Sequence, residues 1–188
     1  MKLKNTYFLL RHGEAKSNKE RFVSCWPEKP YNPLTSRGRE QIEKLIPGLK
    51  KKKIDLIFSS DLLRTKQTAQ IIAQKLKLRI IFDKNLREIQ LGNFNGESED
   101  QLNKFYKTRK QRFTKKMPGG ETYRDVRKRS ENFLKTIEKK YKDKKILIVS
   151  HGAFLFTLQA IVKSLTEKQE IIHRKKLKLK TGELRKVC

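Results

Sequence analysis

The amino-acid sequence predicts an α/β fold, a three-layer α/β/α sandwich with a mostly parallel central sheet. Short apolar runs of four or five residues, bounded by polar residues and glycine, are typical of buried parallel strands. Segments with helical spacing of apolar residues separate these runs, and such alternation is typical of a parallel sheet covered on both faces. No internal repeat or linker interrupts the pattern, so the 188 residues are expected to form a single domain spanning residues 1–188.

The apolar runs give the expected strands. Parallel strands are expected at residues 7–10, 54–58, 79–82 and 146–149, and a C-terminal strand pair around residues 177–179 and 184–187. Two stretches lack periodicity and are expected to be loops: residues 17–33, with three prolines and the only Trp, and residues 86–98, with two glycines. The first of these loops is expected to lie over the strand ends, where long loops tend to be functional.

Capping residues mark where the helices begin. Thr35 is expected to N-cap a helix that Pro47 and Gly48 end. Ser60 or Asp61 is expected to cap the next helix, whose apolar face falls within residues 62–76. A capping box that begins at Thr122 starts a helix reaching about residue 141. The remaining helices are a basic amphipathic one over residues 100–113 and one over residues 153–163.

The net charge of +27 raises the question of a polyanionic partner. Lysine is spread over nearly every expected surface, however, and a lysine-rich coding bias explains this without any partner. Nucleic acid is therefore not the expected partner. Residues 104–116 are the exception, because seven basic residues there alternate with Phe105, Tyr106 and Phe113, a pattern compatible with binding phosphates. The role of this segment stays open at this point.

Cysteine usage favours a reducing compartment. Cys25 and Cys188 form no disulfide framework and no metal-ligand spacing, so a cytoplasmic protein without a metal or cofactor is expected. The apolar run at residues 7–10 is too short for a signal-peptide core or a membrane span, and no membrane association is expected. Nothing in the sequence indicates an oligomeric state.

Two of the three histidines follow directly after expected strands: His12 and His151. In open α/β sheets ligands bind beyond the carboxyl ends of the strands, so both histidines are expected at one crevice. A strand-end histidine can attack phosphorus if its reacting nitrogen is neutral and its other nitrogen is held by an acceptor such as a backbone carbonyl. His12 is the expected nucleophile.

A transferred phosphoryl group carries negative charge on three oxygens, so its site needs fixed cations. Arg11 is adjacent to His12, and Arg64 lies at the start of the helix after the strand at residues 54–58. Glu88, in the loop after the third strand, is the best-placed proton donor for the leaving oxygen, with Glu14 as runner-up. We expect surroundings of Glu88 that favour its neutral form, because a general acid must carry the proton.

Six motifs in order resemble the histidine phosphatase superfamily, the family of cofactor-dependent phosphoglycerate mutases and related acid phosphatases. They span most of the chain: RHGEAKSN at residues 11–18, PLTSRGREQ at 33–41, SSDLLRTKQTA at 59–69, LREIQLGNFNG at 86–96, PGGET at 118–122 and SHG at 150–152. The sequence departs from the family at residues 22–26, where relatives often have a glycine, and at Asn95, where an acidic residue is more usual. These departures bear on specificity and leave the reaction type alone.

The resemblance implies roles for particular residues. His12 would become phosphohistidine, and Glu88 would protonate the leaving group and later activate water. Arg11, Arg64 and His151 would form the phosphate pocket, together with Asn18, which matches the family's pocket asparagine, and Gly152 of the last motif.

Together these features predict a metal-independent phosphomonoester hydrolase that acts on a small phosphorylated metabolite through a phosphohistidine. Two alternatives remain: a cofactor-dependent phosphoglycerate mutase, and a basic nucleic-acid-binding module on an inactive phosphatase fold. The intact set of expected catalytic residues speaks against the second alternative. The sequence does not indicate which phosphomonoester is the substrate.

Overall fold

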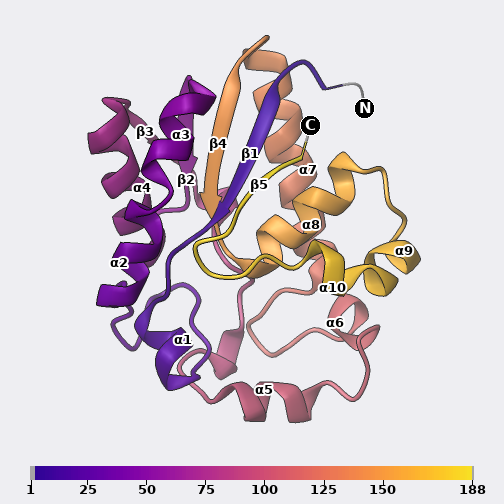
Figure 1. Cartoon of the computed structure of the whole chain (residues 1–188). Coiled ribbons are helices and arrows are strands. Elements are labelled where there is room, and N and C mark those ends of the chain that lie inside the picture. The colour runs from indigo at the N-terminus through magenta and orange to yellow at the C-terminus, as the bar shows by residue number, and fades with distance from the viewer. Residues whose placement is uncertain (1–2, 188) are drawn as a thin grey trace.

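A computed structural model describes residues 3–187 (Figure 1). Within them, five strands form one sheet in the order β3-β2-β4-β1-β5. The strands are β1 (Thr6–Arg11), β2 (Leu56–Ser59), β3 (Ile80–Phe82), β4 (Lys145–Ser150) and β5 (Leu184–Lys186). The first four are mutually parallel, and β5 runs antiparallel to β1 at the edge. The predicted three-layer sandwich with a mostly parallel sheet is confirmed.

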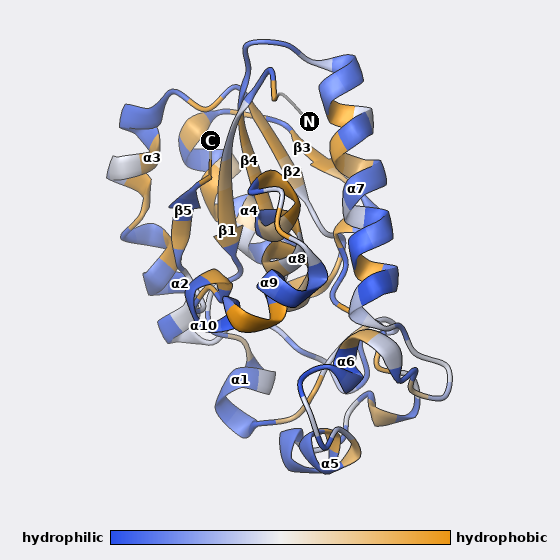
Figure 2. Ribbon diagram, turned by 90° about the vertical axis from the view of Figure 1, so that its right-hand side faces the viewer, coloured by the Kyte–Doolittle hydropathy of each residue, from blue (hydrophilic) through white to orange (hydrophobic). Residues whose placement is uncertain are grey.

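Alternating side chains of the strands build two apolar cores. On β1, Leu9 packs into the core beneath α7 (Tyr123–Lys140) and α8 (Gly152–Val162), whereas Leu10 packs into the core beneath the opposite helices. Those opposite helices are α2 (Ser36–Glu43), α3 (Ile46–Lys52) and α4 (Leu63–Leu76). Figure 2 shows the apolar strands enclosed between helices with hydrophilic outer surfaces. The sheet is therefore buried on both faces, and its carboxyl ends remain as the open edge.

Two of the three predicted helix starts are confirmed. Thr35 caps α2 by accepting the Gly38 N–H, and Thr122 forms the predicted capping box at the start of α7. Pro47 does not end a helix, because it lies in the first turn of α3, where the missing N–H of proline leaves no hydrogen bond unmade. The cap of α4 was also predicted wrongly: neither Ser60 nor Asp61 but Leu62 is the N-cap residue, without a side-chain cap.

Short helices cover the carboxyl ends of the strands (Figure 1). They are α1 (Lys16–Glu20), inside the predicted loop, and α5 (Glu99–Phe105) and α6 (Gln111–Thr114), which replace the single predicted helix over residues 100–113. The predicted helix is interrupted between Phe105 and Gln111. There the side chain of Gln111 accepts the Lys107 N–H and the hydroxyl of Thr108 accepts the Gln111 N–H, and these bonds stabilise a turn in place of a continuous helix.

The C-terminal segment differs from the predicted strand pair. The strand at residues 184–187 is confirmed as β5, but residues 177–179 form no strand. Instead α9 (Glu167–Ile172) and α10 (Arg174–Leu177) precede it, and Leu177 and Leu179 are buried. No helix within residues 3–187 is long and apolar enough to cross a membrane.

Candidate active site

The sheet topology brings the two predicted histidines together. His12 follows β1 and His151 follows β4, and these two strands are hydrogen-bonded neighbours in parallel register. The centroids of the two imidazole rings lie 5.3 Å apart, and both side chains are almost completely buried. One crevice at the carboxyl end of the sheet therefore holds both, as expected for a ligand site in an open α/β sheet.

The hydrogen bonds of His12 determine its tautomer. Nδ1 lies 2.8 Å from the carbonyl oxygen of Gly13, which can only accept, so Nδ1 carries the proton. Nε2 accepts from the Nε of Arg64 across 3.3 Å. Burial lowers the pKa of His12 well below 6.5, and the neighbouring charges of Arg64 and Arg11 lower it further. His12 is thus a neutral imidazole with its Nε2 lone pair toward the pocket cations.

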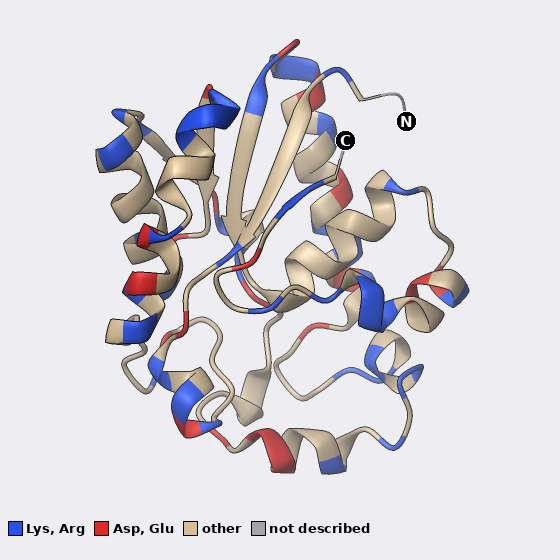
Figure 3. Cartoon of the chain, viewed as in Figure 1, with Lys and Arg blue, Asp and Glu red and all other residues tan. Residues whose placement is uncertain are grey.

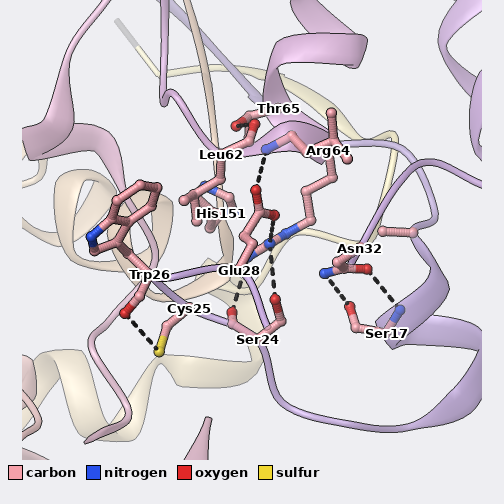
Figure 4. Close-up of polar contacts among 12 residues, drawn as sticks. Ser17, Ser24, Cys25, Trp26, Glu28, Asn32, Leu62, Arg64, Thr65 and His151 are labelled. Atoms are coloured by element: carbon pink, nitrogen blue, oxygen red, sulfur yellow. Dashed lines mark hydrogen bonds and ion pairs between the residues drawn. The ribbon is translucent and has the colours of Figure 1, made fainter. Parts of the chain in front are cut away.

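Arg64 is held by a ring of acceptors that the sequence did not reveal (Figure 4). Its Nη1 donates to the carboxylate of Glu28 at 2.8 Å and its Nη2 to the carbonyl oxygen of Ser24 at 3.1 Å. The second carboxylate oxygen of Glu28 accepts the backbone N–H of Leu63, in the first turn of α4. Glu28 therefore serves both as the ion-pair partner of Arg64 and as the missing cap of α4.

His151 lies behind His12 and does not line the pocket itself. Its Nε2 is 2.9 Å from the hydroxyl of Ser60, and its Nδ1 is buried with no hydrogen-bond partner among the described residues. Burial lowers its pKa well below 6.5, and the charge of Arg64 lowers it further. His151 is accordingly neutral and adds no charge to the site.

Glu88 is bound by the first turn of α8. Its two carboxylate oxygens accept the backbone N–H groups of Ile89, Gly152 and Ala153 at 2.9–3.0 Å. Two of these donors, Gly152 and Ala153, belong to the N-terminus of α8, and the third is the neighbouring Ile89, so each carboxylate oxygen of Glu88 accepts hydrogen bonds. Glu14, the runner-up, bonds Thr35 and does not line the pocket.

The remaining predicted residues lie around the same pocket. Arg11 donates to the carbonyl oxygen of Leu179, and its buried Nε has no partner among the described residues. Gly152 lies between Arg11 and Glu88, since a Cβ added there would be 3.7 Å from the guanidinium carbon and 3.6 Å from the carboxylate. Asn18 lines the pocket while its Oδ1 accepts the Ala15 N–H, which orients the side chain.

The pocket has a volume of about 180 Å³. Arg11, His12, Asn18, Arg64, Glu88 and Gly152 line it, and of the predicted site residues only His151 does not. The structure also adds lining residues from the covering segments, among them Ser24, Tyr123, Arg112 and Arg174. The guanidinium groups of Arg11 and Arg64, the neutral imidazole of His12 and the carboxylate of Glu88 lie together at the strand ends and give a site suited to a phosphate ester.

One departure from the family pattern has a structural role. Asn95 does not line the pocket; its side chain accepts the Cys25 N–H and donates to the carbonyl oxygen of Pro27. It thereby fixes the loop that carries Ser24 and Glu28. Cys25 is a free, buried thiol, and the other cysteine, Cys188, lies outside the described residues.

Sequence signals for the residues that were missed are weak. Glu28 lies in an aperiodic loop 36 positions before Arg64, so neither spacing nor pattern links the two. Within residues 3–187 no group of three or more His, Cys, Asp or Glu side chains is arranged to hold a metal ion.

Comparison with known proteins agrees with this geometry. The model of the histidine phosphatase superfamily (branch 1) matches residues 7–186. A probable phosphoglycerate mutase of Escherichia coli, GpmB, is 31% identical over 160 residues, which cover 82% of this chain and 73% of that protein.

Solved structures show the same fold. YhfR of Bacillus stearothermophilus is 28% identical and superposes with a TM-score of 0.80 over 96% of this chain and 89% of that one. The mycobacterial glucosyl-3-phosphoglycerate phosphatase, 23% identical, has a TM-score of 0.78 over 95% of this chain and 87% of that one. The chain therefore belongs to branch 1 of the histidine phosphatase superfamily.

Proposed function

We propose that this chain is a single-domain, cytoplasmic phosphomonoester hydrolase that acts on a small phosphorylated metabolite through a phosphohistidine at His12. The observation that carries the proposal is the state of His12: a buried, neutral imidazole whose Nε2 lone pair faces the guanidinium of Arg64. Attack on a phosphoryl group requires a nucleophile and a phosphate-binding cation that are directed at the same point.

In the first step, Nε2 of His12 forms a bond to phosphorus while the bond from phosphorus to the ester oxygen breaks. Arg11 and Arg64 stabilise the negative charge on the three phosphoryl oxygens. His151, whose ring lies 5.3 Å from that of His12, is neutral and adds no charge to the site. Glu88 donates a proton to the departing oxygen, so that an alcohol leaves. The carbonyl of Gly13 stabilises the positive charge that forms on the imidazole.

In the second step, the carboxylate of Glu88 takes a proton from water and the oxygen of that water attacks phosphorus. The bond from phosphorus to Nε2 breaks, inorganic phosphate leaves, and His12 returns to its neutral form. The three N–H donors around Glu88 stabilise the carboxylate that this step needs at its start.

A phosphoglycerate mutase is the second candidate, and the identity to GpmB favours it. A mutase must keep water from the phosphohistidine while the product reorients, which requires bulk over the pocket. Here two short helices, α5 and α6, cover the pocket, and most residues of the segment that joins them are exposed. Several similar structures carry phosphatase names, among them a glucosyl-3-phosphoglycerate phosphatase and an α-ribazole phosphatase. We therefore favour hydrolysis.

Labelling tests the covalent step. Incubation with a phosphate-labelled monoester and acid-free quenching should leave a base-stable, acid-labile label on the wild-type protein and none on His12→Ala. His173→Ala serves as a control, because this histidine lies outside the pocket. Full turnover by His12→Ala would contradict the mechanism.

Product analysis separates the hydrolase from the mutase. With 3-phosphoglycerate and catalytic 2,3-bisphosphoglycerate, a hydrolase releases inorganic phosphate and a mutase accumulates 2-phosphoglycerate. Isomerisation that far exceeds the hydrolysis of every monoester tried would favour the mutase.

A further inference from the structure

The pocket extends beyond the reacting centre to a group of cations. Its wall away from His12 is lined by Arg112, Arg174 and Lys178, which we call the cationic shelf. The same three residues line an adjoining cavity of about 440 Å³, together with further cations, Lys107, Arg109 and Lys175. The shelf is built from two chain segments about 60 residues apart, around α6 and α10, which Figure 3 shows as basic elements near the strand ends.

Apolar packing fixes the position of the shelf. Phe113 of α6 and Leu177 of α10 belong to one buried cluster with Phe156 of α8. Phe113 directly follows Arg112, and Leu177 lies three residues after Arg174, so this buried cluster fixes the backbone that carries both arginines. Arg112 is further held by a 2.9 Å hydrogen bond to Asn103 and by its position over the ring of Tyr106.

The arginines of the shelf differ from most other buried or half-buried arginines because they form no ion pair with a carboxylate of the described residues. Among residues 3–187, eight arginines are buried or half-buried, and five of them form an ion pair with a carboxylate: Arg64, Arg87, Arg127, Arg129 and Arg185. The remaining three are Arg11, Arg112 and Arg174, and all three line the same pocket. A coding bias toward basic residues does not explain why the unpaired half-buried arginines gather at one place.

The electrostatics of the shelf indicate a site for an anion. Burial lowers the pKa of Arg112, and the neighbouring charge of Arg174 lowers it further, so the fold holds two half-buried like charges near each other. Glu99 also lines the pocket but forms no ion pair with either arginine within the described part of the chain. An anion placed between the two guanidinium groups would remove this repulsion.

Tyr123 connects the shelf to the reacting centre. Tyr123 lines the pocket, burial raises its pKa, and it is near enough to the shelf arginines Arg174 and Arg112 and to Glu88 to interact electrostatically with all three. A ligand that extends from His12 past Tyr123 would therefore reach the shelf.

We propose that the cationic shelf binds a second anionic group of the substrate, a carboxylate or a second phosphate, while the phosphoryl group to be transferred lies at His12. This proposal rests on the proposed function for the identity of the first site, and it narrows the substrate class to monoesters that carry another negative charge. Guanidinium groups suit both anions, because their N–H groups match carboxylate and phosphate oxygens in pairs.

Matched substrate pairs test the shelf. 3-Phosphoglycerate and glycerol 1-phosphate differ by a carboxylate in place of a hydroxymethyl group, and fructose 1,6-bisphosphate and fructose 6-phosphate differ by a second phosphate. The wild-type protein should prefer the doubly anionic member of at least one pair by kcat/KM. The pair that shows the preference identifies the second anion.

The test variant is Arg174→Gln combined with Lys178→Gln. Neither side chain makes a hydrogen bond or ion pair with another described residue, so this variant removes charge without removing an internal contact. It should raise KM for the preferred substrate about 10- to 100-fold, since each charge-assisted hydrogen bond lost accounts for roughly one factor of ten. Glycerol 1-phosphate and p-nitrophenyl phosphate should be hydrolysed as before.

The matched control is Lys110→Gln combined with Lys176→Gln. It removes the same amount of charge, one from each of the two segments that build the shelf, at exposed residues that line neither cavity. The control should behave like wild type with every substrate. Equal effects of both double variants, or no preference of the wild type within either pair, would overturn the proposal.

A binding titration tests whether the shelf binds an anion even if no substrate is turned over. Calorimetry should show that 3-phosphoglycerate or fructose 1,6-bisphosphate binds more tightly than its singly anionic partner, and that the test variant loses this difference. If no monoester is hydrolysed, the proposed function fails, and the titration alone decides whether the shelf binds an anion. Equal binding by wild type and test variant would then refute the shelf.

Discussion

The Nε of Arg64 donates a hydrogen bond to Nε2 of His12 across 3.3 Å. Only an imidazole with its proton on Nδ1 can accept this hydrogen bond at Nε2. The Gly13 carbonyl favours this tautomer because it accepts a hydrogen bond from the Nδ1–H. The lone pair that accepts from Arg64 is the one that would attack phosphorus. The residue whose charge adds to burial in lowering the pKa of His12 is thus also the residue expected to bind the incoming phosphate.

The neutral state of the two buried histidines, His12 and His151, can be observed directly. Because their pKa values are lowered well below 6.5, mainly by burial, the imidazole NMR signals of His12 and His151 should keep their neutral chemical shifts as the pH falls from 7.5 to 5.5. Variants His12→Gln and His151→Gln assign the signals. A midpoint near 6.5 for either histidine would contradict the buried, neutral pair.

Glu88→Gln should slow hydrolysis in a way that depends on the leaving group. A glutamine keeps the size of the side chain but supplies no acidic proton, so alkyl phosphates should lose roughly 10²-fold in kcat, and activated aryl phosphates less. Glu14→Gln is the control, since Glu14 lies outside the pocket. Equal losses for both substrate types would assign the acid role to another group.

Glu28→Gln should increase the affinity for inorganic phosphate. Burial raises the pKa of Glu28, whereas the hydrogen bond from the Leu63 N–H and the charge of Arg64 lower it. In its ion pair with Arg64, the Glu28 carboxylate partly neutralises the charge of the guanidinium. A glutamine keeps an acceptor for the guanidinium but removes the competing charge, so the inhibition constant of phosphate should fall about fivefold or more. Glu97→Gln removes an equal charge from an exposed side chain and should change nothing. Weaker inhibition by phosphate in Glu28→Gln would refute this competition.

Glu170, which pairs with Arg127, should make stability depend on pH. Burial raises its pKa from 4.5 to about 7, so between these values the folded protein binds more protons than the unfolded chain. The stabilisation from this carboxyl is complete below pH 4.5 and is lost as the pH rises through 7.

Urea unfolding of Glu170→Gln measures this loss. Between pH 5 and pH 8 the wild type should lose on the order of 2 kcal/mol of unfolding free energy relative to the variant. Glu167→Gln, one turn away and paired with exposed Arg124, is the control. A difference between wild type and Glu170→Gln that does not change with pH would show that Glu170 is ionised throughout.

Several features could be predicted because their causes lie close together in the sequence. The cap of α2 joins Thr35 to Gly38, and the box of α7 joins Thr122 to Asp125, each three residues apart. Continuous apolar runs predicted the parallel strands, and neighbouring parallel strands necessarily have their carboxyl ends at the same edge of the sheet. The meeting of His12 and His151 therefore followed from the sequence pattern alone.

Other features required the folded chain, because their partners are remote in the sequence. Local pattern does not show that α4 takes its cap from Glu28, 35 residues before Leu63. The basic segment was visible as a pattern, but its convergence with Arg174 was not, since about 60 residues separate them. The sequence by itself determined the sheet and the residue types at its edge, whereas packing between distant segments decided which charges are paired and which remain open to an anion.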